Sequence, residues 1–595
     1  MPARLPAQLI LGLLVPAAVP AAETRLALDS ALWEVRRNSE VARPAGTGGV
    51  LTVTADALRV ESWLTGTTSP RFEYRRRLPL VHGSILGRYR TAGLLPRQAR
   101  VRLQFFAGEQ SLPTRDYALA ASEAWSDFAL PIIRPPTGAD SVRVAFGLAE
   151  KTAGRVEFAD LRVTDHYDAP KFADGPIALT RPAPPSPLAP AARVRLESAN
   201  GAWWLVDPAG QPFFSNGSAG AAGRRGEPLA PVAAQLRQLG FNSLGGSHDF
   251  KGWAAYNEAQ LATGRPYLFQ FRILETRVDA GYDTLVDATG ANPGTPQAQA
   301  AQRGGFNHAF PDPFDPRWRA AIEARVRETL AVVRDQPYFA GWFADNEREH
   351  RDLHRYVWSP RCAAAFRRFL EAKHTAIAAL NAAWGTGFTS FDDLLAKKPD
   401  PVVRAGAMFT DFRLFSREIL RELNATILRT IRTADPGRIV LSNRFMIGEI
   451  ADVLENLDLY RDFDVIAVNI YPSNLAAGLD RAERQFLEEV HRRSGRPVLI
   501  GEWSVPALDS GLYANPARLD WSYPQAVDTQ AQRARQAAQI QADLYNLPFV
   551  IGAHWFIWRD VDSPTRQANR GLFRADGRPW PELTQALAEL NHRLR

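Results

Sequence analysis

Apolar and polar residues alternate in short runs over the first part of the chain, from about Thr24 to Asp165. Turn residues separate these runs, as in VLTVTADALRVESW, GSILGRYRTAG and ARVRLQFFAG, and no long helical period is present. Alternation with a period of two is typical of strands that bury one face. The pattern therefore predicts an antiparallel β-sandwich over residues 23–168.

A proline-rich stretch, RPAPPSPLAPAA, follows within residues 169–192 and predicts a semi-rigid linker. After Arg193, short apolar strands that end in polar residues alternate with amphipathic helical stretches, the rhythm of a parallel βα architecture. Eight strands are expected, at Pro212–Gly217, Phe241–Gly246, Pro266–Phe271, Phe339–Asn346, Arg438–Asn443, Asp464–Tyr471, Pro497–Trp503 and Phe549–Phe556. The fold class is thus α/β, with a (β/α)8 TIM barrel over residues 193–595.

The N-terminal residues and the composition bear on location and partners. Residues 1–22 place one arginine before an apolar run and small residues, which predicts a signal peptide and a secreted or periplasmic protein with no membrane span after cleavage. The net charge of +7 is spread over interspersed residues, so it indicates a solvated surface more than an anionic partner. The single cysteine, Cys362, excludes an internal disulfide and is expected to be buried on a helix.

Glutamates stand at the ends of two predicted barrel strands. FAGWFADNE ends in Asp345, Asn346 and Glu347, and RPVLIGEW ends in Glu502 beside Trp503. Reactive groups of such barrels come from the C-terminal ends of the strands. Glycoside cleavage needs one carboxyl that stays protonated and another that stays ionised. The gap between them, about 5 to 5.5 Å for retention and about 6.5 to 9.5 Å for inversion, is not set by the sequence.

The order of Asn-Glu after the fourth strand and Glu after the seventh is similar to that of the clan A retaining glycosidases. More specifically, the barrel resembles glycoside hydrolase family 50, the β-agarases. The motifs are GAWWLVDPAGQPFFSNG, GFNSLGG, FPDPFDPRW, GWFADNE, LNAAWGTGFTSFDDLL, GEWSVPALDSGLY and GAHWFIWRD with NRGLF, which together extend from Gly201 to Phe573. The resemblance implies double displacement on β-galactosidic linkages in a polysaccharide such as agarose, with Glu347 as acid/base and Glu502 as nucleophile.

Other segments qualify this expectation. GRVEFADLRVTD resembles the last strand of a jelly-roll carbohydrate-binding module, although the sandwich could equally be a packing domain. The chain has GEW where the β-agarases tend to have GEF, and Arg348, Glu349 and His350 where they have an aromatic or Ser-Trp pair. These positions border the substrate groove. Another β-glycan, such as a sulfated galactan, a mannan or an exopolysaccharide, and a non-catalytic carbohydrate-binding protein therefore remain alternatives.

Further residues have expected roles beside the two glutamates. The resemblance implies that Asn346 hydrogen-bonds the sugar 2-hydroxyl and that Tyr471 donates to Glu502 and keeps it ionised. Trp555 is expected to form a stacking floor for the sugar. Asp345 and Glu349 compete for the acid role. The remaining candidates for substrate contact, each of which could instead pack or support a loop, are His554, Asn216, His248, Asn443 and Arg444.

Several function classes have no motif in the chain. HEXXH is absent and the ten histidines are scattered, so no metal site is expected. The chain also lacks the phosphate-binding G-x-x-x-x-G-K-[ST] and the G-x-S-x-G elbow, which argues against nucleotide hydrolysis and esterase chemistry. The sequence has no basic helix of the kind that binds nucleic acid, so no nucleic-acid partner is expected. The expected partner is a polysaccharide or oligosaccharide, no cofactor is expected, and the oligomeric state is left open.

Overall fold

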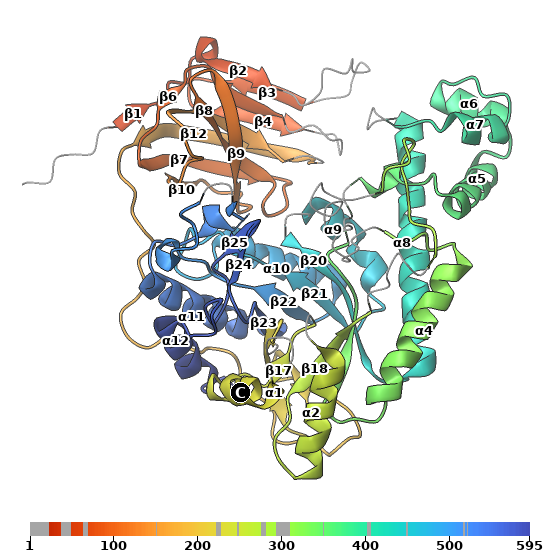
Figure 1. Cartoon of the computed structure of the whole chain (residues 1–595). Helices are drawn as coiled ribbons and strands as arrows, with labels where there is room; N and C mark the ends of the chain where they lie inside the picture. The colour runs from red at the N-terminus through yellow and green to blue at the C-terminus, as the bar shows by residue number, and fades with distance from the viewer. Residues whose placement is uncertain are drawn as a thin grey trace, which may run out of the picture.

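The computed structural model describes most of the chain outside its N-terminus and several loops. The described residues are 23–36, 49–62, 70–149, 152–221, 228–246, 249–274, 281–292, 310–348, 350, 352–401, 406–447, 450–515, 518–520 and 522–594. The predicted signal peptide, residues 1–22, lies outside them. The chain forms an antiparallel sandwich and a closed parallel barrel, as predicted (Figure 1).

Two antiparallel sheets make up the sandwich. One has the strand order β10-β7-β12-β4-β3 with β1 on β12, and the other has the order β2-β5-β11-β8-β9 with β6 on β11. The strands are β1 (Glu23–Arg25), β2 (Trp33–Arg36), β3 (Gly49–Val53), β4 (Leu58–Ser62), β5 (Arg71–Tyr74), β6 (Leu78–Pro79), β7 (Gly83–Ala92), β8 (Ala99–Ala107), β9 (Gln110–Leu119), β10 (Ser126–Ile132), β11 (Ser141–Leu148) and β12 (Gly154–Thr164), with the short helix η1 (Ser30–Leu32) before β2.

The sandwich core follows from the alternation seen in the sequence. On β8, Val101, Leu103 and Phe105 are buried while the residues between them are half-buried. Phe146 of β11 and Phe158 of β12 meet between the sheets with their ring centroids 5.2 Å apart. Each strand thus turns one face inward, which is what a period of two requires.

Eight strands close the barrel, and every neighbouring pair is parallel. They are β16 (Ser215–Ala219), β17 (Ser243–Leu244), β18 (Phe269–Ile273), β19 (Phe339–Asn346), β20 (Ile439–Met446), β21 (Val465–Asn469), β22 (Val498–Trp503) and β23 (Val550–Phe556). The prediction differs at the first strand, because Pro212–Gly217 is divided at Phe214. Only its second half enters the barrel.

The first half of that predicted strand belongs to a small sheet that closes the barrel floor. This sheet has the order β13 (Arg195–Ala199), β14 (Ala202–Val206) and β15 (Pro212–Phe213). Phe213 stacks on Phe269 of β18 with the ring centroids 4.3 Å apart. Val194 and Leu205 join the same apolar cluster as the inward residues of the barrel strands. The sheet therefore covers the interior at the N-terminal ends of the strands.

Helices surround the barrel, and α5 to α8 form a projection between β19 and β20 (Figure 1). Cys362 on α5 is a buried free thiol, as predicted. Among the described residues, no helix combines the length and apolar character that crossing a bilayer requires. The helices are α1 (Leu229–Gln238), α2 (Phe250–Ala262), α4 (Pro316–Val333), α5 (Pro360–His374), α6 (Ile377–Trp384), α7 (Phe391–Lys397), α8 (Gly406–Ala434), α9 (Ile450–Asn456), α10 (Arg481–Ser494), α11 (Gln530–Asn546) and α12 (Pro581–Asn591). Shorter elements are the helical turns η3 (Leu353–Arg355), η5 (Leu457–Tyr460), η6 (Leu508–Ser510) and η8 (Tyr523–Gln525), and the hairpin of β24 (Val561–Ser563) and β25 (Arg566–Ala568).

Residues 169–192 lie against the outside of the barrel. Arg181 is 7% exposed, and its guanidinium donates to the carbonyls of Tyr545, Leu547 and Val550 at 2.9 to 3.0 Å, and to that of Trp203. Burial lowers the pKa of Arg181 to about 10, which still leaves it charged at neutral pH. The predicted linker is therefore fastened to the barrel at this residue rather than acting as a free spacer.

Candidate active site

Glu347 and Glu502 lie at the C-terminal rim of the barrel, at the ends of β19 and β22. Glu347 follows the last residue of β19 with a φ of +49°, a left-handed conformation that costs energy for a residue with a side chain. Its N–H donates to the carbonyl of Arg444 on β20 at 3.1 Å, which holds this turn. Glu502 is 5% exposed and lies one residue before the end of β22.

The end of β21 contacts both carboxylates. Asn469 Nδ2 donates to Glu347 Oε1 at 2.7 Å, and the Tyr471 hydroxyl donates to Glu502 Oε2 at 2.5 Å, the contact expected of it. Burial and the negative charge of Glu502 raise the pKa of Tyr471 well above its ordinary value, so its hydroxyl remains a donor. Because only Ile470 separates the two donors, the two carboxylates converge on one strand end.

Charges of both signs surround Glu502. Burial is the largest influence and raises the pKa of its carboxyl, whereas the guanidinium of Arg444, with Nη2 3.1 Å from Oε1, lowers it. The negative charge of Glu347 raises the pKa further, and the Tyr471 hydrogen bond and Arg570 lower it. On balance the pKa lies above that of an ordinary glutamate. Ionisation of Glu502 therefore depends on the cationic and hydroxyl groups around it.

The residues beside Glu347 differ in how they are occupied. Asn346 is half-buried, and its Oδ1 has no hydrogen-bond partner among the described residues, which leaves an acceptor without a donor beside Glu347. Asp345, one alternative acid, is 5% exposed and accepts a bond from Arg348 Nε at 2.6 Å. The Asp345 carboxylate is thus engaged in an ion pair with Arg348. The other alternative, Glu349, lies outside the described residues.

Trp555 does not offer the stacking surface predicted for it. It has no exposed surface, its indole N–H donates to the carbonyl of Arg570 at 2.9 Å, and its ring packs edge-on against Trp503 with centroids 4.8 Å apart. Both faces of the indole are covered, so the expectation is corrected. Phe556, the next residue, is partly exposed and has its ring 6.4 Å from that of Tyr471.

His554 and Asn216 lie inside the barrel wall rather than at the rim, so their predicted substrate contacts are wrong. His554 is fully buried with Nε2 3.0 Å from Ser215 Oγ and its ring 5.5 Å from Phe271. Asn216 is 2% exposed and accepts a bond from Gln541 of α11 at 3.1 Å. Successive strand residues face opposite sides, so Asn216 points to the helix layer while Ser215 points inward.

Three candidates remain, and one of them, Arg444, pairs with Glu502. Asn443 is 5% exposed, and its Oδ1 accepts a bond from the N–H of Arg348 at 3.3 Å, so it supports the loop after β19, and its contact with substrate stays a prediction. His248 lies outside the described residues. Asn469 and Phe556 were not predicted. Phe556 lies two residues after His554 on β23 and so shares its inward face. The alternation of side chains along the strand could therefore have indicated Phe556.

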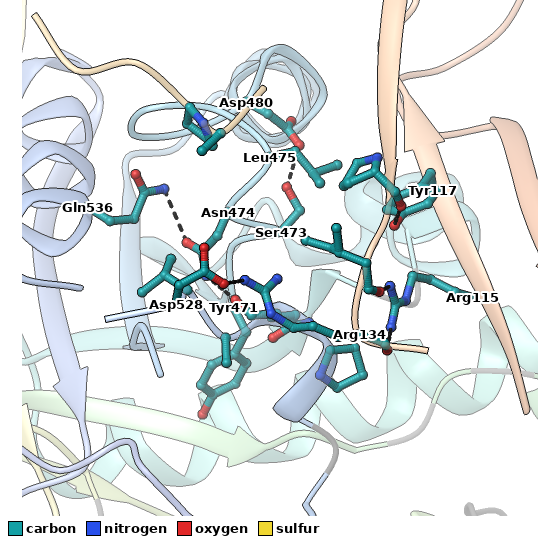
Figure 2. A pocket seen from close by; sticks show the side chains of 18 of the residues that line it. Arg115, Tyr117, Arg134, Tyr471, Ser473, Asn474, Leu475, Asp480, Asp528 and Gln536 are labelled. Atoms are coloured by element: carbon teal, nitrogen blue, oxygen red, sulfur yellow. Dashed lines mark hydrogen bonds and ion pairs between the residues drawn. The ribbon is translucent and has the colours of Figure 1, made fainter. Parts of the chain in front are cut away.

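A pocket of about 400 Å³ lies between the sandwich and the barrel rim, beside Tyr471 (Figure 2). Arg115 and Tyr117 of β9 line it from the sandwich, and the segment after β21 lines it from the barrel. Arg134 Nη2 reaches Asp528 Oδ1 at 2.6 Å and joins the two parts of the molecule. In Figure 2 the hydroxyl of Tyr471 points away from these residues, so the pocket lies behind the tyrosine that contacts Glu502.

The sequence is similar to known glycosidases over this barrel. The family model described as "Beta-galactosidase", of glycoside hydrolase family 42, matches residues 295–518, which include both Glu347 and Glu502. β-Agarase A of Vibrio sp. (strain JT0107) is 26% identical over 472 residues, covering 68% of this chain and 46% of that protein. The β-galactosidase Bga of Halorubrum lacusprofundi is 28% identical over 271 residues, covering 44% of this chain and 37% of its own. The chain thus spans about half the length of the curated β-agarases that it matches.

Solved structures share the whole architecture. The structure titled "an agarase, AgWH50C" has a TM-score of 0.56 at 15% identity and covers 96% of this chain and 99% of its own. A structure described as an exo-β-agarase has a TM-score of 0.55 at 14% identity, with coverages of 97% and 98%. At this identity the likeness concerns the fold. Together with the sequence matches, it confirms the resemblance that the motifs indicated: the chain is similar to β-agarases, including those with solved family 50 structures, and to the β-galactosidases of family 42.

Proposed function

We propose that this protein is an exported retaining glycoside hydrolase that cleaves β-galactosidic linkages in a polysaccharide such as agarose. The observation that carries the proposal is the convergence of two strand-end glutamates on the end of β21, where Asn469 contacts Glu347 and Tyr471 contacts Glu502. The predicted signal peptide supports export, and the names of the relatives support the galactoside class.

In the first step, Glu502 attacks the anomeric carbon of the bound sugar. The bond from that carbon to the leaving oxygen breaks, and Glu347 donates its proton to this oxygen. Burial raises the pKa of Glu502, but the direct contacts of the two carboxyls differ in a way that supports this division of roles. Glu502 contacts a guanidinium and a hydroxyl donor, both of which favour a carboxylate, whereas Glu347 receives a bond from the neutral amide of Asn469.

In the second step, Glu347 accepts a proton from water, which attacks the same carbon and releases Glu502. Two displacements at one carbon leave the product with the configuration of the substrate. The partnerless Oδ1 of Asn346 is suited to accept a bond from the sugar 2-hydroxyl in the transition state.

A polysaccharide panel with product analysis tests the substrate. Purified protein is incubated with agarose, sulfated galactans, mannans and bacterial exopolysaccharides, and the products are separated and identified. Oligosaccharides from agarose, with the β-anomer formed first by NMR, are expected. Activity on another glycan alone would show that agarose is not the substrate. An α-anomer formed first would show that the mechanism is inverting. Tight binding without product would indicate a binding protein.

Two variants test the carboxylates on whichever glycan the wild type cleaves. Glu502→Ala should lose turnover, because no group replaces the nucleophile. Glu347→Ala should lose about 10²- to 10⁴-fold in rate, the usual contribution of a general acid. With a good leaving group and added azide, Glu347→Ala should recover turnover and form a glycosyl azide. Glu371→Ala on the surface of α5 is the matched control, and normal turnover by Glu502→Ala would refute the assignment.

A further inference from the structure

Arg444 on β20 is buried completely and directed at Glu502. Its Nη2 lies 3.1 Å from Glu502 Oε1, and its Nη1 donates to the carbonyl of Gly501 at 3.3 Å. The ring of Phe343 lies 5.5 Å from the guanidinium carbon. A buried guanidinium needs a partner of opposite charge, and among the described residues the carboxylate that pairs with it is Glu502.

Gly501 leaves the space that Arg444 occupies. A Cβ at position 501 would come within 2.5 Å of Arg444 Cδ and 2.8 Å of Asn469 Oδ1. Side chains at this distance would have to move, and both of these groups contact a carboxylate of the site. The glycine before Glu502 is therefore explained by the close approach of Arg444, not by an unusual backbone angle.

Glu502 is thus held by both oxygens, Oε2 by the Tyr471 hydroxyl and Oε1 by Arg444. We propose that Arg444 is a positioning residue, which orients the Glu502 carboxylate and keeps it ionised, and that Gly501 exists to admit it. This inference rests on the proposed nucleophilic role of Glu502. It gives Arg444 a role other than the substrate contact or loop support that the sequence suggested for it.

The groups that face Glu502 set the direction of the expected effect. They are Arg444 from β20, Tyr471 from the end of β21, Glu347 from the end of β19 and Arg570 after β25. Burial already raises the pKa of Glu502, and Arg444 is the largest opposing influence. Removing an opposite charge at this distance should raise the pKa by about 1 to 3 pH units.

The first test reads the ionisation of Glu502 without any sugar. The carboxylic-acid infrared band of the full-length protein is titrated against pH, and subtraction of the Glu502→Gln spectrum isolates Glu502. Arg444→Met should raise its midpoint by about one pH unit or more. Arg444→Lys should give a smaller rise, because the ammonium keeps the positive charge but cannot also reach the Gly501 carbonyl as the guanidinium does. Gly501→Ala keeps every charged group, yet it should raise the midpoint by displacing Arg444.

The matched control is Arg438→Met. Arg438 is equally buried but precedes β20 at the opposite end of the barrel, where it pairs with Asp435. It should lower stability and leave the midpoint of Glu502 in place. An unchanged midpoint in Arg444→Met, or an equal rise in Arg438→Met, would overturn the inference. If Arg444→Met does not fold, Arg444→Lys and Gly501→Ala decide, and unchanged midpoints in both overturn it.

The second test is the pH profile of kcat/KM on a cleaved glycan. The acid limb should move to higher pH in Arg444→Met and Gly501→Ala by the same interval as the infrared midpoint, a displacement that simple loss of stability does not produce. The two proposals fail separately. A wild type that cleaves no β-galactosidic polymer contradicts the proposed function, whereas the infrared titration still decides the role of Arg444.

Discussion

Tyr471 is the neutral donor among the charged groups around Glu502. Replacing it by phenylalanine removes one bond to a carboxylate and leaves the ring in place. Since hydrogen bonds to charged groups contribute about 1.5 to 3 kcal/mol, kcat/KM of Tyr471→Phe should fall about 10- to 100-fold. The acid limb of its pH profile should move upward, because this bond lowers the pKa of Glu502. Steady-state kinetics over a pH series measures both effects.

Tyr256→Phe is the matched control for that variant. Its hydroxyl accepts a bond from Arg237 between α1 and α2, away from the glutamates. The control should keep both the rate and the pH profile of the wild type. A Tyr471→Phe enzyme with an unmoved acid limb would show that the tyrosine does not support the ionised form of Glu502.

Glu483, near the start of α10, is a buried carboxyl outside the site. Its oxygens accept bonds from the N–H groups of Ser473 and Asp480 at 2.7 and 2.9 Å. Burial and the charge of Asp480 raise its pKa to about 7 against the effect of Arg97. A glutamate in the unfolded chain has a pKa of about 4.3, so between this pKa and that of the folded state Glu483 carries a proton that the unfolded chain has lost. The stability of the folded protein should therefore fall as the pH rises from one pKa to the other.

Glu483→Gln should remove this pH dependence. Urea unfolding at several pH values between about 5 and about 8 should show the variant gaining stability relative to the wild type as pH rises. The exposed Glu582 on α12 provides the control Glu582→Gln, which should follow the wild type throughout. A constant difference between Glu483→Gln and the wild type would contradict the raised pKa.

At the scale of single residues, position at a strand end was enough to select Glu347 and Glu502, whereas the contact of Tyr471 with Glu502 was implied by the resemblance to the clan A glycosidases. The same rule misplaced Trp555 and Asn216, because it ignores which face of the strand a residue occupies. The packing of inward residues fixes that register, and packing depends on distant parts of the chain. The pairing of Arg444 with Glu502 likewise depends on how β20 and β22 lie around the closed barrel.

At the scale of elements, apolar runs were sufficient to find the barrel strands. The run at Pro212–Gly217 was misread as one strand, because its turn-forming residues stand at its two ends and none falls at Phe214, where the structure divides it. What separates them is tertiary, namely the antiparallel pairing of Phe213 with Leu205 below the barrel. A parallel partner on each side of β16 then defines the barrel portion.

Arg181 should matter more for stability than its place in a proline-rich segment suggests. Arg181→Met retains much of the packing on Trp204 but leaves buried carbonyls without a donor, so the free energy of unfolding should fall by about 1 to 3 kcal/mol. Arg327→Met is the control, since Arg327 forms a surface pair with Glu323 on α4 that should contribute about 0 to 1 kcal/mol. Denaturant unfolding compares them, and equal small losses would contradict the fastening role.

At the scale of the whole molecule, the sandwich docks on the barrel through a few polar contacts. Gln485 of α10 donates to the carbonyl of Ala121 at 3.1 Å and accepts from its N–H at 2.9 Å, and Arg134 pairs with Asp528. The double variant Gln485→Ala/Asp528→Ala should loosen this contact. Hydrogen exchange should rise around Ala121 and the start of α10, while the barrel strands β19 to β22 stay protected.

Glu489→Ala is the control for the docking variant. Glu489 lies on the same helix but pairs with Arg492 and Arg493. Exchange around Ala121 should match the wild type in this control. Unchanged exchange in the double variant would show that other contacts hold the sandwich. The contact between the sandwich and the barrel could not be predicted from the sequence, because the sequence pattern around a polar surface residue such as Gln485 does not indicate which residue it contacts.

The route of residues 169–192 limits how such a barrel can acquire new modules. Phe172 lies under Arg535 near the rim end of α11, whereas the N–H of Thr180 donates to Asn546 at the far end of the same helix. The connection thus descends the height of the barrel before the first strand begins at the floor (Figure 1). A module fused directly ahead of β13 would lie at the floor of the barrel, away from the glutamates at its rim. A recombination event that places a new module beside the glutamates must therefore exchange the sandwich together with residues 169–192.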